Sequence, residues 1–171
     1  HRGLTKQRNY GVSNVSKDSD IICFLDDDTV LTPNYFEEII KVYAAFPDAL
    51  GVGGYINNET KWEKVAEDYD PTIKEFAYDG WKQKDGIRFV LRKLLGLDSD
   101  TKPGFLPEFS NGRSISFLPP SGKIYEVEQL MGGVSSFKKS VFNSFKFSTY
   151  FEGYGLYEDA DFTLRLSKTG K

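Results

Sequence analysis

Segments with helical spacing of apolar residues alternate with short continuous apolar runs at the start of the chain. The run Ile21-Ile22-Cys23-Phe24-Leu25 is typical of a strand buried on both faces. Pro33 suits the first turn of a helix, with Thr32 as its cap. The pattern thus predicts a helix over about residues 3–15, a strand over 21–25, a helix from 32 to about 47 and a strand over 50–56. This alternation indicates an α/β sheet with crossover helices.

The middle of the chain, about residues 57–125, breaks this alternation. It holds both tryptophans, several proline and glycine turns and one amphipathic stretch, Gly86 to Leu97, which predicts a helix. The pattern further predicts strands near residues 114–118 and 124–127, a return to the central sheet over 126–134, a short helix over 138–145 and a last helix over 157–167, ended by Gly170. We therefore expect one domain over residues 1–171, with 57–125 as an elaboration within it.

Composition and charge exclude several classes of protein. Hydrophobic residues make up 39% of the 171 positions, which is enough for a packed core and argues against disorder. The chain has 22 basic and 25 acidic residues and no basic block, so nucleic acid is not an expected partner. Its apolar runs are far shorter than the ~20 residues that span a bilayer. The expected location is cytoplasmic. Attachment to the inner face of a membrane would be made by regions outside this chain.

The scarcity of histidine and cysteine restricts the chemistry. His1 is the only histidine and Cys23 the only cysteine. A Ser-His-Asp triad, a Cys-His pair and a histidine or cysteine zinc site therefore lack their parts. Any metal must be held mainly by oxygen, and the expected general base is a carboxylate, with lysine or tyrosine as the weaker alternatives.

Three carboxylates, Asp26-Asp27-Asp28, directly follow the predicted strand 21–25. In open α/β sheets, ligands bind beyond the carboxyl ends of the strands. If the extended backbone continues, Asp26 and Asp28 point to one side of it and Asp27 to the other. A divalent cation, Mg²⁺ or Mn²⁺, would offset the repulsion within this pair while bridging a diphosphate. The alternative interpretation is a solvated acidic turn before the next helix.

A second acidic group, Glu158-Asp159-x-Asp161, lies at the start of the last predicted helix. The helix dipole alone favours acidic residues there, which is the simpler interpretation. The preceding loop favours a ligand site, because Gly153 and Gly155 flank Tyr154, the aromatic residue best placed to face a ligand. The pair Gly132-Gly133, expected to follow a strand, either lets the backbone approach a substrate or forms a turn or bulge.

Four motifs occur in order along the chain: Gln7-Arg8-Asn9-x-Gly11; Cys23-Phe24-Leu25-Asp26-Asp27-Asp28 with Pro33 following; Met131-Gly132-Gly133-x-Ser135-Ser136-Phe137-Lys138-Lys139-x-Val141-Phe142; and Gly153-Tyr154-Gly155-x-x-Glu158-Asp159-x-Asp161-Phe162-x-x-Arg165-Leu166. Together they resemble the family 2 glycosyltransferases, over about residues 3–56 and 126–171. The resemblance implies an α/β, GT-A-like (Rossmann-related) fold in which helices flank a central mixed sheet, and residues 57–125 resemble the family's variable acceptor-side region.

The resemblance also implies roles for individual carboxylates. Asp26 and Asp28 would form the Asp-x-Asp pair that holds a divalent metal, Mg²⁺ or Mn²⁺, together with the diphosphate of the donor. Asp28 would be the more direct ligand of the two. Asp159 would be the general base, while Glu158 and Asp161 would shape the acceptor site or the start of the helix.

The implied enzyme is a metal-dependent, inverting glycosyltransferase of the hexosyltransferase type, as used in polysaccharide biosynthesis. It would move a sugar from a nucleotide-diphosphate sugar to a hydroxyl of a saccharide or lipid-linked saccharide acceptor. Arg8 would lie near the donor nucleotide, and Gly132 and Gly133 at the junction of donor and acceptor, with Tyr154 facing the substrate.

Two departures from the family pattern stand out. Family members have about two βα units before the point that matches Gly3, and many place a metal-associated histidine after the Glu-Asp motif. The chain is therefore expected to be a fragment, incomplete at the N-terminus and at the C-terminus and inactive by itself. Its exposed sheet edge would then favour self-association.

Two alternative functions stay open at this point. One is a metal-dependent nucleotidyltransferase, against which the absence of a glycine-rich phosphate loop counts. The other is a non-catalytic carbohydrate- or metal-binding module, although the aspartate triplet lacks the spacing of a Ca²⁺-binding EF-hand loop.

Overall fold

The computed structural model describes residues 3–57, 59–109, 112–152 and 155–169 and divides the chain into two compact units. Unit 1 combines the chain up to residue 54 with the chain from residue 128 onward, and unit 2 is the stretch between them. The helices and strands of unit 1 are α1 (Leu4–Ser13), β1 (Ile21–Leu25), α2 (Tyr35–Ala45), β2 (Gly51–Gly53), β6 (Val134–Lys138) and α4 (Glu158–Ser167), with short 3₁₀ helices at Lys139–Asn143 and Thr149–Phe151. Both strands and both helices expected before residue 57 are confirmed, and so is the final helix.

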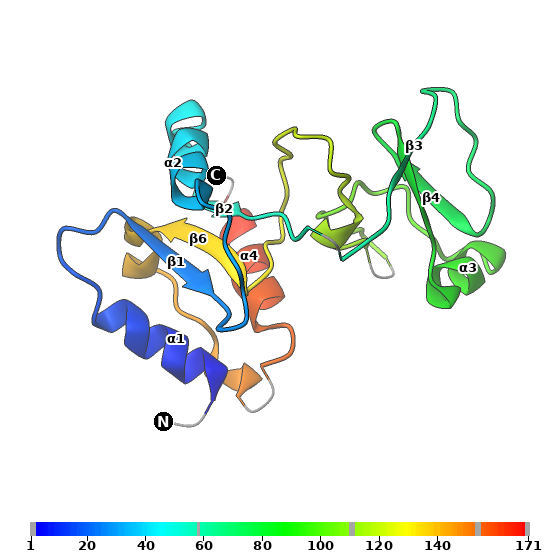
Figure 1. Cartoon of the computed structure of the whole chain (residues 1–171). Coiled ribbons are helices and arrows are strands. Elements are labelled where there is room, and N and C mark those ends of the chain that lie inside the picture. Colours follow the sequence, from blue (N-terminus) through cyan, green and yellow to red (C-terminus); the bar gives the residue numbers. More distant parts are fainter. Residues whose placement is uncertain (1–2, 58, 110–111, 153–154, 170–171) are drawn as a thin grey trace. The chain divides into compact units, whose positions relative to one another are not determined.

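The sheet of unit 1 has the strand order β1-β6-β2, with β6 antiparallel to both neighbours (Figure 1). β1 and β2 therefore run in the same direction, and α2 forms the crossover between them. Leu25 pairs with Val134 at one end of the sheet and Gly53 pairs with Ser135 beside it. The expected α/β class is confirmed, with one later strand inserted between the two strands of the crossover.

The expectation that residues 126–134 return to the sheet is wrong, because the returning strand is β6 and begins at Val134. Gly132 and Gly133 therefore form a turn before this strand rather than after one. Ser135 and Ser136 make the segment look polar, yet both are buried. The Ser136 hydroxyl donates to the Val52 carbonyl at 2.9 Å, which offsets the cost of burying it.

The strand β1 is less buried than its uninterrupted apolar run predicts. Only Ile22 is buried, and the other four residues are partly exposed. In the part of the chain that the structure describes, β1 pairs with β6 alone and lies at an edge of the sheet. The expectation of burial on both faces is therefore wrong for four of its five residues.

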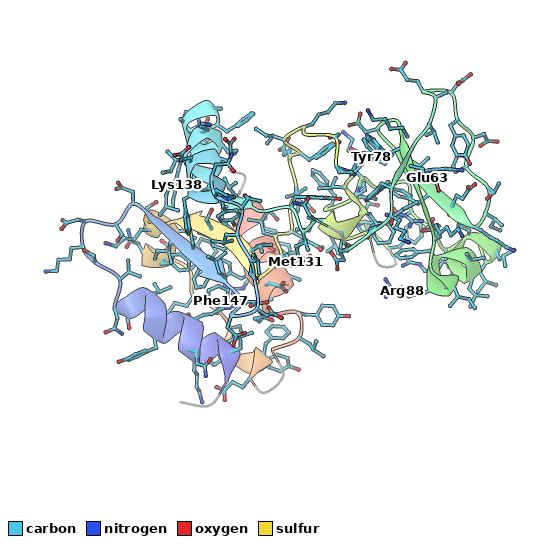
Figure 2. All side chains as sticks on the ribbon, viewed as in Figure 1. Glu63, Tyr78, Arg88, Met131, Lys138 and Phe147 are labelled. Atoms are coloured by element: carbon cyan, nitrogen blue, oxygen red, sulfur yellow. The ribbon has the colours of Figure 1, made fainter. Side chains whose placement is uncertain are left out.

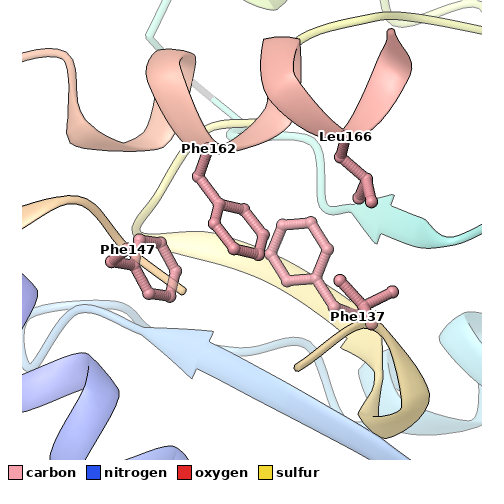
Figure 3. Close-up of a cluster of buried hydrophobic side chains, with 5 residues drawn as sticks. Phe137, Phe147, Phe162 and Leu166 are labelled. Atoms are coloured by element: carbon pink, nitrogen blue, oxygen red, sulfur yellow. The ribbon is translucent and has the colours of Figure 1, made fainter. Parts of the chain in front are cut away.

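Unit 1 has a mostly aromatic core cluster between α4 and β6 (Figure 3) and a second cluster formed by Ile39 and Tyr43 of α2 with Val52 of β2. Phe162 of α4 is fully buried and stacks on Phe147, with ring centroids 4.3 Å apart. Phe162 also contacts Phe137 in an edge-to-face arrangement, with ring centroids 5.1 Å apart. Burying one such side chain contributes roughly 1.5–3 kcal/mol. This packing fixes the start of α4 against the sheet.

In its described residues, unit 2 contains a second antiparallel sheet and one α-helix. Its elements are β3 (Glu63–Lys64), β4 (Glu75–Tyr78), β5 (Trp81–Lys84), α3 (Ile87–Leu94) and a 3₁₀ turn at Ile115–Phe117, and the strand order is β3-β5-β4. The expected helix within 86–97 is confirmed as α3. The strand expected near 114–118 is wrong, because the amide of Phe117 bonds the carbonyl of Ser114 and winds the segment into a 3₁₀ turn. Residues 124–127, also expected as a strand, have no regular structure.

Among the described helices, none has both the length and the apolar character that crossing a bilayer requires.

Candidate functional site

The aspartate triplet forms a turn directly after β1. The amide of Asp26 donates to the Gly133 carbonyl at 3.0 Å, which extends the pairing with β6 by one residue. The amide of Thr29 then donates to the Asp26 carbonyl at 3.1 Å and closes a turn with Asp27 and Asp28 at its centre. The extended backbone thus ends at Asp26, so the condition under which strand alternation would align Asp26 with Asp28 is not met. The three side chains are exposed and bond no described residue.

Asp159 is held by the turn that precedes β6. Its Oδ2 accepts a hydrogen bond from the Gly132 amide at 2.9 Å, and its Oδ1 accepts one from the Ala160 amide at 2.7 Å. Gly133 of the same turn bonds Asp26 through its carbonyl. The two-glycine turn therefore links Asp159 at the start of α4 to Asp26 at the end of β1.

Both glycines of this turn are closely approached by side chains of the protein itself. A Cβ atom at Gly133 would lie 2.6 Å from the carboxyl carbon of Asp26. A Cβ atom at Gly132 would lie 2.7 Å from Nη2 of Arg8. Real Cβ atoms essentially never lie so close to other atoms, so a side chain at either position would displace the Asp26 carboxylate or the Arg8 guanidinium.

Arg8 of α1 and Glu158 of α4 form a buried ion pair. The Nη1 of Arg8 lies 2.7 Å from Oε1 of Glu158, and the side chains are only 9% and 5% exposed. The guanidinium also lies 5.3 Å from the centre of the Phe147 ring. Burial raises the pKa of Glu158, and although the charge of Arg8 acts in the opposite direction, burial is the larger effect. Arg8 is thereby held by the protein, beside Gly132.

Asn9, the next residue of α1, fixes the segment that leads to α4. Its Nδ2 donates to the Phe147 carbonyl at 2.8 Å, and its Oδ1 accepts from the Phe147 amide at 3.0 Å. One amide side chain thus satisfies both backbone groups of a residue outside regular structure. The sequence interpretation gave Asn9 no role, although its place next to Arg8 in the first motif is a signal for one.

The remaining carboxylate of the acidic group is engaged elsewhere. Asp161 Oδ2 accepts from Arg165 Nε at 2.9 Å, one helical turn further along α4. Arg165 also donates to the Lys146 carbonyl at 2.8 Å. Asp161 therefore stabilises α4 and its neighbouring segment. The predicted ligand-facing residue Tyr154 lies outside the described residues.

Tyr157 precedes the acidic group in a backbone conformation that is uncommon for a bulky residue. Its φ is 67°, in the left-handed region, and its side chain is 73% exposed. Such a conformation costs on the order of 1–3 kcal/mol and concentrates at functional sites. Sequence reasoning missed Tyr157, because nothing in its neighbours signals a positive φ.

The predicted site residues therefore fall into two groups. The structure brings together six of them: Arg8, Asp26, Gly132, Gly133, Glu158 and Asp159. Asp28 adjoins this cluster through the chain, whereas Asp161 bonds Arg165.

The carboxylates at the end of β1 suit a divalent metal only in combination with a substrate. Within the described ranges, no three or more His, Cys, Asp or Glu side chains converge as a metal site. Mg²⁺ usually binds one or two protein carboxylates and completes its shell with water and substrate phosphates. Asp26 and Asp28 are exposed oxygen ligands without a cation partner in the described structure, so they fit that arrangement.

Comparison with known proteins gives one match. The family model for glycosyl transferase family 2 matches residues 1–106, which include α1, β1 and the aspartate triplet and amount to more than half of the chain. No significant match is found among curated proteins or among solved structures. Members of this family generally use nucleotide-sugar donors and saccharide acceptors, and the α/β architecture fits a GT-A-like fold. The chain belongs to glycosyl transferase family 2.

Proposed function

We propose that this glycosyltransferase is metal-dependent and inverting, and that it moves a hexose from a nucleotide-diphosphate sugar to a hydroxyl of a saccharide or lipid-linked saccharide acceptor. One observation carries the proposal. The Gly132-Gly133 turn bonds Asp159 on one side and Asp26 on the other, which joins a candidate base to a candidate diphosphate site. An enzyme that transfers a group between two substrates needs these functions side by side.

Asp159 is the carboxylate best suited to act as the general base. Glu158 is buried and paired with Arg8, and Asp161 is paired with Arg165. Asp159 accepts two backbone hydrogen bonds, whereas an ionised carboxylate offers about four lone-pair positions, so acceptor sites remain for a substrate hydroxyl. No ion pair involves its side chain within the described structure.

The reaction that these residues would catalyse is a single displacement. The acceptor oxygen forms a bond to the anomeric carbon from the face opposite the diphosphate, while the bond from that carbon to the diphosphate oxygen breaks. The hydroxyl proton passes to Asp159, and the nucleoside diphosphate leaves with the electron pair. Asp26 and Asp28 would hold Mg²⁺ or Mn²⁺, which when bound would offset the negative charge of the departing diphosphate.

The buried residues of the cluster act on the reaction through position. The Arg8–Glu158 ion pair ties α1 to the start of α4, which carries Asp159. Gly132 lies against Arg8 and bonds Asp159, so the proposed base depends on this pair for its placement. Direct contact of Arg8 with the donor nucleotide remains a prediction, as do the acceptor-side roles of Tyr154 and Asp161.

Asp28→Asn tests the metal-dependent part of the proposal, with Asp27→Asn as its control. Both residues are exposed and lie at the centre of the same turn, so neither substitution removes a contact that stabilises the fold. Because the family resemblance makes Asp28 the more direct metal ligand, we expect Asp28→Asn to weaken Mn²⁺-dependent binding of a nucleotide-diphosphate sugar by about tenfold or more, and Asp27→Asn to change it little. Calorimetry with and without Mn²⁺ measures both. Equal losses from the two variants would remove the special role of Asp28.

Gly133→Ala is expected to separate donor binding from stability. The new Cβ would displace the exposed carboxylate of Asp26, which can move without disturbing the core. We expect the free energy of unfolding to change by less than about 1 kcal/mol, while Mn²⁺-dependent donor affinity falls.

Gly51→Ala is the matched control for Gly133→Ala. Its Cβ would lie 2.7 Å from the Phe137 ring and 2.9 Å from Leu130. Overpacking of this kind costs about 1–3 kcal/mol. Urea unfolding and calorimetry on both variants give the comparison, and unchanged donor affinity in Gly133→Ala would contradict a donor-binding role for the Asp26 carboxylate.

A further inference from the structure

The helix α3 of unit 2 turns its apolar side to solvent. Its exposed residues at helical spacing form what we call the leucine stripe: Ile87, Leu91, Leu94 and Leu95, which are 79%, 51%, 64% and 70% exposed. Leu97, just beyond the helix, is 47% exposed. A surface helix of a globular protein normally buries such a stripe. An apolar stripe left in water indicates an interaction surface.

The opposite side of α3 is what holds the helix to unit 2. Phe89 is 5% exposed and its ring lies 4.2 Å from the guanidinium carbon of Arg113 and 5.0 Å from the Phe117 ring. Lys93 pairs with Asp85 at 2.8 Å and donates to the Glu75 carbonyl at 2.6 Å. Because an aromatic residue and a cation anchor the helix, the leucine stripe is left free to bind something else.

Positive charge borders the leucine stripe. Residues 84–97 contain Lys84, Arg88, Arg92 and Lys93 and a single acidic residue, Asp85. The Asp85 side chain is fully buried, where it pairs with Arg113 and Lys93. Lys84 and Arg88 are exposed, and Arg88 is labelled on α3 in Figure 2. The surface formed by this segment is therefore apolar and cationic, without an exposed carboxylate.

We propose that α3 binds the surface of a membrane that contains anionic lipids. The leucine stripe would enter the boundary between headgroups and acyl chains, and Lys84 and Arg88 would contact lipid phosphates, as in other amphipathic helices with basic flanks. The eight residues of α3 are about 12 Å long, far less than the thickness of a bilayer, so the helix would lie in the plane of the surface. This inference does not depend on the proposed catalytic residues.

A second copy of the chain is the less favourable occupant of this surface. A pairing of two leucine stripes would bring two surfaces of the same positive charge together, because each copy carries the exposed residues Lys84 and Arg88. Like charges in contact disfavour such a dimer, whereas an anionic bilayer neutralises them. Charge complementarity thus favours an anionic membrane over a second copy of the chain as the partner of the leucine stripe.

Cosedimentation with vesicles tests the proposal on the whole chain. We expect binding to vesicles of equimolar phosphatidylcholine and phosphatidylglycerol, and much weaker binding to phosphatidylcholine alone. Leu91→Gln/Leu94→Gln should lower the partition coefficient by about tenfold or more, because two exposed leucines no longer enter the interface. Arg88→Gln should lower it by about fivefold, and only on the anionic vesicles.

The control is Phe36→Gln/Ile40→Gln on α2, where two apolar side chains are 51% and 59% exposed outside the leucine stripe. This variant should bind as the unchanged chain does, and circular dichroism should show the same helix content in all variants. Failure of the folded chain to bind anionic vesicles would overturn the proposal, as would equal losses from the control. A dimer in sedimentation velocity that Leu91→Gln/Leu94→Gln converts to a monomer would assign the leucine stripe to a second copy instead.

Discussion

Asp159→Asn should lower the rate of sugar transfer by about 10²–10⁴-fold, the usual contribution of a positioned general base, and leave donor affinity nearly unchanged. The asparagine keeps one carbonyl oxygen that can accept the Gly132 amide, so the two-glycine turn is preserved. It cannot take a proton from the acceptor hydroxyl at neutral pH. The measurements are single-turnover transfer rates in the active enzyme and calorimetric affinity for a nucleotide-diphosphate sugar.

Asp161→Asn provides the control for this prediction. It removes a carboxylate from the same turn of α4, but that carboxylate bonds Arg165 rather than the two-glycine turn. A partly exposed pair of this kind contributes little to stability, about 0–1 kcal/mol, and we expect a much smaller change in the transfer rate. If Asp161→Asn were the more damaging variant, or Asp159→Asn retained normal turnover, the base would have to be reassigned.

Arg8→Met should destabilise the protein by about 3–5 kcal/mol at neutral pH, because it leaves the Glu158 carboxylate buried without its cation. The loss should depend on pH. Burial already raises the pKa of Glu158 above its ordinary value of 4.5, and the substitution removes the charge that lowers it most. A carboxyl group whose pKa is raised on folding contributes stability that is fully present below the unfolded pKa and is lost as pH rises through the folded pKa. Urea unfolding should therefore show a smaller defect near pH 4.5 than at pH 8.

The double substitution Arg8→Met/Glu158→Leu separates the ion pair from the packing around it. Replacing both members of a buried pair by apolar side chains of similar size is often nearly neutral. We expect this variant to recover most of the stability that Arg8→Met loses and to show no corresponding pH dependence. A double variant as unstable as the single one would mean that the Arg8 side chain acts through packing on Phe147 instead.

The spacing of apolar residues was sufficient to locate the elements in which those apolar residues are buried. α4 is an example, because its buried residues Phe162 and Leu166 follow one another at helix spacing. β6 was missed because Ser135 and Ser136 are polar and yet buried. The Ser136 hydroxyl is satisfied by Val52, 84 residues away, and also lies 3.2 Å from the Tyr43 hydroxyl. Contacts at such separations leave no trace in local spacing.

The orientation of α3 was equally beyond local pattern. Its spacing predicts an amphipathic helix but not which side faces the protein. Arg113, 24 residues after Phe89 in the chain, binds the Phe89 ring and draws that side of the helix inward. Long-range packing thus overrode the usual preference for burying leucine.

What the sequence by itself determined is which side chains the candidate site can use. Without internal histidine, and with cysteine only at Cys23, the expected groups for proton transfer or metal binding are carboxylates, and these lie after β1 and at the start of α4. Only the tertiary structure decided which carboxylate is buried in an ion pair and which is not. Glu158 is buried against Arg8, 150 residues away in the chain, and Asp159 bonds the Gly132 amide. Burial and ion pairing depend on these distant partners, and a carboxylate's position in the chain carries no information about either.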